Sequence, residues 1–157
     1  VLDFFEDVEQ RIYPVGRLDY DTSGLLLMTN DGDLDNRLTH PKYEVEKTYV
    51  AKVEGIPTND ELKQLRIGVV VNGHKTSPAK TNVLETDTSK KTAVVQLTIH
   101  EGKNHEVKNM FKAVGHPVKK LKRESFAFLN LRGLQPGDYR PLKKFEVEKL
   151  YEITEKR

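Results

Sequence analysis

A polar loop precedes the first long apolar run of the chain and contains the residues best suited to chemistry. Within residues 16–24 (Gly-Arg-Leu-Asp-Tyr-Asp-Thr-Ser-Gly), Arg17 and Asp19 flank Leu18. A carboxylate held at the mouth of a buried strand is rigid and partly desolvated, which suits a nucleophile or a general base. The alternative is a simple turn, in which Asp19 and its polar neighbours accept hydrogen bonds from backbone amides. The loop residues alone leave both interpretations open.

The charge of the chain is balanced overall but uneven along its length. The 157 residues include 26 Lys and Arg against 24 Asp and Glu, which gives a formal net charge of +2. A protein that holds nucleic acid by bulk charge alone would be more basic. Basic residues concentrate in 103–123, where Glu106 is the acidic exception. This distribution predicts a local basic face on a near-neutral body.

Several classes of protein are excluded or disfavoured by composition. The chain contains no cysteine, so it has neither a disulfide framework nor thiol chemistry. No apolar run approaches the roughly 18 residues of a membrane span. The opening residues are too acidic for a secretory signal. We therefore expect a protein of the cytoplasm with no contact with membranes.

Two patterns resemble metal sites but fail on spacing. Residues 31–35 (Asp-Gly-Asp-Leu-Asp) mimic the start of a calcium loop, yet Asn36 stands where the turn glycine belongs and Lys42 where the bidentate glutamate belongs. His100 and His105 straddle an expected strand-to-helix boundary with no cysteine nearby, which is a poor ligand spacing. The sequence also lacks a glycine-rich phosphate loop. We expect neither a metal nor a nucleotide cofactor.

Hydrophobic periodicity predicts short elements of both kinds. The expected strands are 24–29, 43–53, 69–71, 80–87, 92–100 and 118–128. The expected helices are 33–38, one opened by a capping box at 58–61, and 104–114, while 145–151 fits a strand or a short terminal helix. This order predicts an α+β domain whose sheet is mixed, mostly antiparallel and flanked by helices.

The clearest helix signal lies between Asn104 and Gly115. Its apolar positions follow the i, i+3, i+4, i+7 spacing of one helix face and are Val107, Met110, Phe111 and Val114. Asn104 is suited to cap the first turn, and Gly115 stands where a left-handed residue ends a helix. His105, Lys108 and Lys112 then form a polar stripe off the apolar face.

Three ordered segments resemble the motifs of one enzyme family. Residues 15–32 (Val-Gly-Arg-Leu-Asp-Tyr-Asp-Thr-Ser-Gly-Leu-Leu-Leu-Met-Thr-Asn-Asp-Gly) resemble the signature of pseudouridine synthases of the RsuA/RluB type. Residues 45–49 (Val-Glu-Lys-Thr-Tyr) are similar to the segment that supplies the tyrosine of that family, and 101–111 are similar to its later basic motif. Residues 115–118 and 121–123 continue the likeness in the order of the family.

The resemblance implies a pseudouridine synthase catalytic fold and an isomerase that acts on uridine in RNA. In this reaction the bond from uracil N1 to the ribose breaks, the base rotates, and a bond to its carbon 5 replaces the first. The required carboxylate is, by resemblance, Asp19. It could attack the ribose anomeric carbon, add to the uracil ring or act as a base, and the sequence does not choose among these. Each route implies that the uridine is flipped into a pocket.

The resemblance also assigns roles to residues outside this loop. Tyr49 is similar to the tyrosine that packs against the flipped base, Lys108 to the basic residue that pairs with the aspartate, and Arg17 to an arginine that contacts phosphate or holds the nucleotide. A sheet aromatic and a solvated helix lysine are the plain alternatives for Tyr49 and Lys108. The other residues expected to contact RNA are Lys47, Lys103, His105, Lys112, Lys119, Lys120, Lys122 and Arg123.

The resemblance also bears on domain organisation and target. Family members usually begin the catalytic domain with a strand containing a Lys-Pro-x-Gly element, often after a small S4 RNA-binding domain. Neither is seen here, so we expect residues 1–157 to be one catalytic domain that is truncated at its N-terminus. Residues 105–108 (His-Glu-Val-Lys) are closer to the small-subunit version of the motif. This predicts 16S ribosomal RNA as the target, with 23S ribosomal RNA as the alternative.

Two other classes of function compete with this interpretation. One is a non-catalytic module that binds or assembles ribosomal RNA on the same scaffold, although binding alone needs no carboxylate facing anionic RNA. The other is a metal-free hydrolase using Asp19, which is weaker because no motif places a second carboxylate. We therefore expect a monomeric, cofactor-free enzyme of ribosomal RNA.

Overall fold

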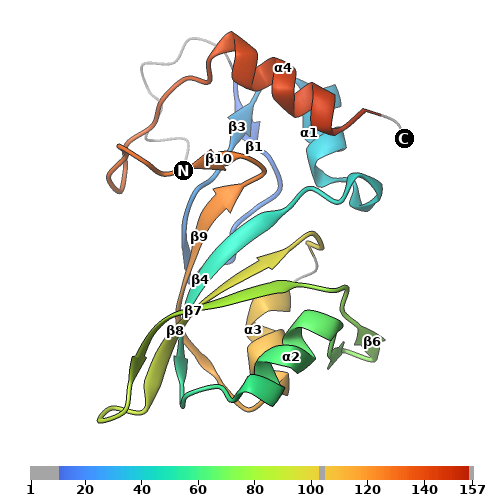
Figure 1. Cartoon of the computed structure of the whole chain (residues 1–157). Helices are drawn as coiled ribbons and strands as arrows, with labels where there is room; N and C mark the ends of the chain where they lie inside the picture. The colour runs from blue at the N-terminus through green and yellow to red at the C-terminus, as the bar shows by residue number, and fades with distance from the viewer. Residues whose placement is uncertain (1–10, 103–104, 156–157) are drawn as a thin grey trace.

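The computed structural model describes residues 11–102 and 105–155 (Figure 1). A six-stranded sheet forms its centre, in the order β10-β9-β4-β8-β7, with β2 paired to β9 outside that path. Its strands are β2 (Thr22–Gly24), β4 (Lys47–Glu54), β7 (Lys80–Asp87), β8 (Thr92–Ile99), β9 (Val118–Phe126) and β10 (Leu129–Asn130). Neighbours on the main path are antiparallel, whereas β2 runs parallel to β9. The predicted α+β fold is confirmed.

Helices gather at two ends of this sheet. In the described part of the chain they are α1 (Gly32–Thr39), α2 (Asn59–Ile67), α3 (Glu106–Ala113), α4 (Lys144–Ile153) and the 3-10 turn η2 (Pro41–Tyr43). Two short strand pairs are β1 (Tyr13–Pro14) with β3 (Met28–Thr29), and β5 (Val70–Val71) with β6 (His74–Lys75). Figure 1 shows α2 and α3 at one end and α1 with α4 at the other. None of the described helices is long and apolar enough to cross a membrane.

Strict alternation of apolar side chains builds the first core. The buried apolar residues of β8 are Ala93, Val95, Leu97 and Ile99, and the residues between them are half-buried. This face packs against α2 and α3 to form the sheet cluster, whose helical members include Leu65 and Phe111, both fully buried. The strands predicted at 80–87 and 92–100 pair as expected.

A second apolar cluster, the end cluster, packs α1 and α4 beside the other end of the sheet. Leu38 and Leu150 belong to it and are almost fully buried. Residues 145–151 are therefore helical, the second of the two predicted alternatives. Phe126 also belongs to this cluster, whereas Leu121, earlier in the same strand, belongs to the sheet cluster. Strand β9 thus joins two cores, and a site can form where they meet.

The strands predicted at 24–29 and 43–53 are shorter than the sequence pattern indicated. The run 24–29 supplies buried Leu25 and Leu27, but β2 ends at Gly24 and β3 begins only at Met28. Gly24 has a φ of +110°, a backbone conformation that residues other than glycine rarely adopt. Strand β4 begins at Lys47 rather than at residue 43, because the turn η2 and the left-handed Glu44 come first.

The helix ends follow local sequence rules where they are described. The predicted capping box of α2 is present: Glu61 N donates to Thr58 Oγ1 at 3.2 Å, and Thr58 N donates to Glu61 Oε1 at 2.9 Å. Gly115, with a φ of +86°, follows α3, and its N–H donates to Lys112 O at 3.0 Å. The N-cap predicted at Asn104 lies outside the described residues. His105 precedes α3 and makes no side-chain cap hydrogen bond.

Gly24 offers a test of how closely β2 approaches β9. A Cβ atom at this position would overlap with the backbone of Arg123, so Gly24→Ala should lower the free energy of unfolding by about 3 kcal/mol. Gly73→Ala is the matched control, because Gly73 also has a positive φ but open space around it, and it should cost only about 1 kcal/mol. Urea unfolding measures both. Equal losses would contradict the close approach.

Candidate active site

A cavity of about 360 Å³ lies where the two core clusters meet. Phe126 of the end cluster and Ile99 and Leu121 of the sheet cluster contribute to its wall. Asp19 and Tyr49, predicted to act together, both line it. The cavity therefore brings together residues that are distant in the sequence, between walls that are partly apolar.

Asp19 lies in the loop between β1 and β2, with its side chain 19% exposed. Its backbone carbonyl accepts a hydrogen bond from Thr22 N at 2.9 Å, which fixes the loop at the start of β2. Its Oδ2 lies 3.1 Å from Nδ1 of His105. The carboxylate is thus partly desolvated, held by the sheet and paired on one side. This is the environment that the sequence argument required of a reacting group.

Strand β4 presents a lysine and the predicted tyrosine to the same cavity. Side chains alternate along a strand, so Lys47 and Tyr49 share the face that carries buried Ala51. In the sheet register, Tyr49 pairs with Leu97 on one side and with Arg123 on the other. Tyr49 is half-buried and packs against the sheet cluster. It therefore supplies a supported aromatic surface in the cavity wall.

The side chain beside Asp19 is not the one that the sequence predicted. Lys108 Nζ contacts Oδ1 of Asp21, so the predicted pairing of Lys108 with Asp19 is wrong in this structure. That hydrogen bond holds the pKa of Asp21 below its usual range. His105 takes the place beside Asp19, because its left-handed backbone, with a φ of +54°, sets it before the first turn of α3. The sequence marked His105 only as an RNA contact.

Lys47 is a half-buried cation in the wall of the cavity. Its Nζ lies 3.5 Å from the backbone carbonyl of Glu101 and 5.9 Å from the centre of the Phe126 ring. Burial lowers the pKa of Lys47, the charge of Arg123 lowers it further, and Glu106 acts in the opposite direction. Lys47 is therefore part of the cavity rather than of the outer surface.

The basic segment 119–123 does not form one strip. Arg123 is only 3% exposed and lines the cavity, so it does not share an exposed surface with the neighbouring lysines, and its predicted contact with RNA stays a prediction. Lys120 and Lys122 pair in register with Lys52 and Val50 and are exposed. They lie on the sheet face opposite the cavity, because side chains alternate along β9.

The remaining predicted RNA contacts are scattered. Arg17 is exposed and lines the cavity, whereas Lys112 and Lys119 are exposed outside it. Lys103 lies outside the described residues.

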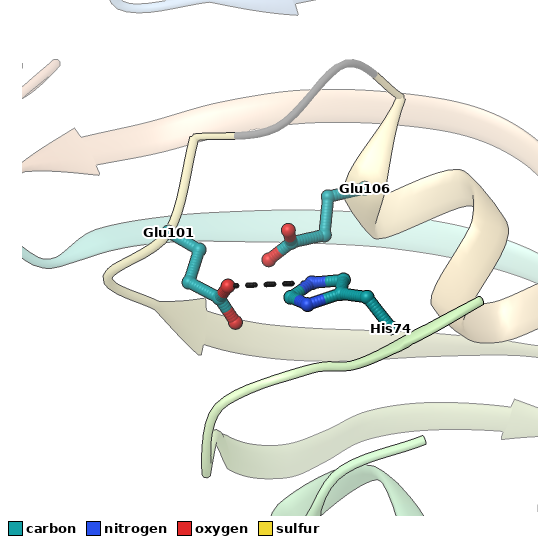
Figure 2. Close-up of side chains that lie close together, drawn as sticks. All are labelled: His74, Glu101 and Glu106. Atoms are coloured by element: carbon teal, nitrogen blue, oxygen red, sulfur yellow. Dashed lines mark ion pairs between the residues drawn. The ribbon is translucent and has the colours of Figure 1, made fainter. Parts of the chain in front are cut away.

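One group of described side chains has the composition of a metal site. His74 from β6, Glu101 after β8 and Glu106 at the start of α3 have ligand atoms within 4.8 Å of one another. Figure 2 shows the two carboxylates converging on the imidazole. An imidazole and two carboxylates suit Zn²⁺ or Mn²⁺. Sequence spacing did not reveal the group, because its members come from three separate elements.

Two contacts hold the side chain of Glu101, and we call them together the clamp. His74 Nε2 lies 3.6 Å from Glu101 Oε2, and the backbone N–H of Ser77 donates to Oε1 of the same carboxylate. Glu101 follows β8, and Glu106 is the first residue of α3. His74 and Ser77 therefore hold Glu101, four residues before the histidine that contacts Asp19.

The clamp can be tested through the amide of Ser77. His74→Asn removes the pair with Glu101, so the Ser77 amide should exchange with solvent about two- to fivefold faster, as expected for a partly exposed pair worth under about 1 kcal/mol. Hydrogen exchange followed by NMR gives the rate. Lys75→Gln, at the exposed next position, is the control. A similar increase in both variants would refute the clamp.

Comparisons with known proteins identify the family to which the chain belongs. The family model described as RNA pseudouridylate synthase matches residues 3–113, and the chain belongs to this family. It is 57% identical over 155 residues to the ribosomal large subunit pseudouridine synthase B of Bacillus subtilis, covering 99% of this chain and 64% of that protein. It is 43% identical over 145 residues to the ribosomal small subunit pseudouridine synthase A of Escherichia coli (strain K12), covering 90% and 60%.

Solved structures show the same fold. A crystal structure of a pseudouridylate synthase superposes with a TM-score of 0.80 at 38% identity, over 88% of this chain and 59% of that one. A protein in an H/ACA RNP bound to a substrate RNA superposes with a TM-score of 0.56 at 16% identity, over 75% and 39%, which bears on the fold alone. The chain thus spans less than two thirds of the length of these relatives.

Proposed function

We propose that this domain converts a uridine of ribosomal RNA to pseudouridine, with Asp19 as the essential carboxylate. Family membership supports this reaction class. The observation that carries the proposal is the position of Asp19: it lies in the cavity wall with Tyr49, is partly desolvated and is paired with His105. A pure binding module would gain nothing from a carboxylate facing anionic RNA.

The cavity suits a single flipped nucleoside. Binding pockets for small ligands measure roughly 300–1,000 Å³, and this one, at about 360 Å³, lies at the lower end. A base inside it would meet the half-buried ring of Tyr49, and stacking on an aromatic ring contributes roughly 1–3 kcal/mol. Asp19 would then lie beside the sugar and the base. From there it can attack the anomeric carbon, add to the ring or take a proton.

Residues at the rim of the cavity are the best placed to contact the RNA as it approaches. Arg17 and His105 are both exposed and both line the cavity, so they are placed to contact the nucleotides on either side of the flipped uridine. Lys120 and Lys122 face the other side of the sheet. A strand that enters the cavity would reach the rim residues before these lysines. Lys112 and Lys119 stay candidate contacts for a more distant part of the RNA.

An experiment can decide which ribosomal subunit contains the substrate RNA. The names of the similar proteins divide between large-subunit and small-subunit enzymes, at 57% and 43% identity. The motif at 105–108 pointed to 16S ribosomal RNA. Offering 16S and 23S RNA separately, each labelled with tritium at carbon 5 of uridine, distinguishes them by tritium release. We propose that the enzyme acts as a monomer in the cytoplasm, where ribosomal RNA is modified.

Asp19→Asn is the central test. The substitution keeps the size of the side chain but removes its charge, so tritium release should fall by roughly a thousandfold or more, as when an essential nucleophile or base is lost. Asp33→Asn, at an exposed position of α1, should keep the wild-type rate. Normal turnover by Asp19→Asn, with circular dichroism showing an unchanged fold, would remove Asp19 from the mechanism.

Two variants of Tyr49 separate stacking from proton transfer. If the ring only stacks on the base, Tyr49→Phe should keep activity and Tyr49→Ala should lose roughly 5- to 150-fold. If the hydroxyl moves a proton, Tyr49→Phe should also lose roughly 100-fold or more. We expect the first pattern. Phe145→Ala, an exposed aromatic of α4, controls for general effects. Full activity in Tyr49→Ala would exclude both roles.

A further inference from the structure

Two cations contribute to the wall of the cavity from neighbouring strands. Lys47 begins β4, and Arg123 lies near the end of β9. Both stand close to one aromatic ring: Cζ of Arg123 is 5.2 Å and Nζ of Lys47 is 5.9 Å from the centre of Phe126. All three residues line the cavity. The same region therefore combines two positive charges with a rigid apolar support.

The guanidinium of Arg123 is held in place, but one of its nitrogens makes no hydrogen bond among the residues that the structure describes. Its Nε donates to the backbone carbonyl of Leu25 at 2.9 Å, and the contact with Phe126 orients its plane. Its Nη2 is buried and makes no hydrogen bond with any described residue. A guanidinium offers five N–H donors, and leaving one of them buried without an acceptor costs free energy. The protein tolerates that cost beside a cavity that a ligand can enter.

The electrostatics of Lys47 indicate the sign of the ligand. Burial and the charge of Arg123 both work against the protonated form of Lys47, as the lowered pKa shows. The carboxylates lining the same cavity are Asp19, Glu101 and Glu106, and the charge of Glu106 favours the protonated form of Lys47. An anion beside Lys47 and Arg123 would offset the repulsion between the two cations.

We propose that Lys47 and Arg123 form an anion subsite that receives a phosphodiester group of the RNA backbone next to the flipped uridine. The inference rests on the proposed function and deepens it. A phosphate fits better than a uracil carbonyl, because it brings charge as well as several acceptor oxygens, and a guanidinium matches such oxygens in pairs. The uracil ring then stays free to stack on Tyr49.

Inorganic phosphate is the simplest probe of this subsite. Titrated into the 157-residue protein, it should shift the NMR signal of the Arg123 Nε–Hε group in a saturable way. Lys47→Met should weaken this binding by about tenfold or more, as expected for loss of a charged partner. Lys63→Met, on the exposed surface of α2, should leave it unchanged. An unmoved Arg123 signal, or equal binding by Lys47→Met and wild type, would overturn the proposal.

RNA supplies the second readout. In wild type the logarithm of the RNA binding constant falls linearly with the logarithm of salt concentration. Lys47→Met should reduce the slope by about 0.7, the value for one phosphate contact to single-stranded RNA. The KM for RNA should rise by about tenfold with kcat less affected. An unchanged slope and KM would show that the pair contacts the uracil or no part of the substrate.

Arg123→Lys provides an independent variant. It keeps the charge but loses the Nε bond to Leu25 and the fork of donors, so phosphate should bind at least several-fold more weakly, with the thermal midpoint recorded to check the fold. Phosphate binding that equals wild type would overturn the role of the fork. If wild type binds phosphate but forms no pseudouridine, the proposed function fails and the anion subsite stands. If it forms pseudouridine and phosphate does not bind, the reverse holds.

Discussion

The parallel pairing of β2 with β9 is the contact on which the geometry of the site depends. Strand β2 is only three residues long, yet it ends the loop that carries Asp19. Leu25, the residue after β2, makes two hydrogen bonds with Arg123 of β9: Leu25 N donates to Arg123 O at 2.8 Å, and Arg123 Nε donates to Leu25 O at 2.9 Å. On its other side, Arg123 pairs in register with Tyr49. One buried arginine thus sets the carboxylate and the aromatic ring relative to each other.

The cavity combines charges of both signs in a partly dry space, where each charge has a stronger effect than on the surface. The negative charges at Glu101 and Glu106 lie toward the β5–β6 hairpin, and Asp19 lies in the loop before β2. The positive charges at Lys47 and Arg123 lie around Phe126. Asp19 and the two cations come from different elements, so the reactive carboxylate and the anionic RNA backbone need not share one position.

Local sequence patterns predicted most of the helices and strands. The features that they missed depend on how distant segments pair in the folded chain. The capping box at Thr58 and the alternation in β8 depend on neighbours in sequence, so they were read correctly. The burial of Arg123 could not be read, because a run of basic residues looks uniformly solvated until alternation on β9 assigns each one to a face. The pairing of His105 with Asp19 depends on a single left-handed residue before α3, and no local rule marked it.

The order in which the chain is made has a bearing on the site. Asp19, Tyr49 and His105 all precede residue 118, where β9 begins. A growing polypeptide that ends before this strand already contains the carboxylate, the ring and the imidazole, but not the partner that fixes β2. Contacts of such long sequence separation form late, because closing a long loop costs entropy before the contact is made. Assembly of a competent cavity is therefore a late event in folding, coupled to β9 rather than to the segments that carry the reacting groups.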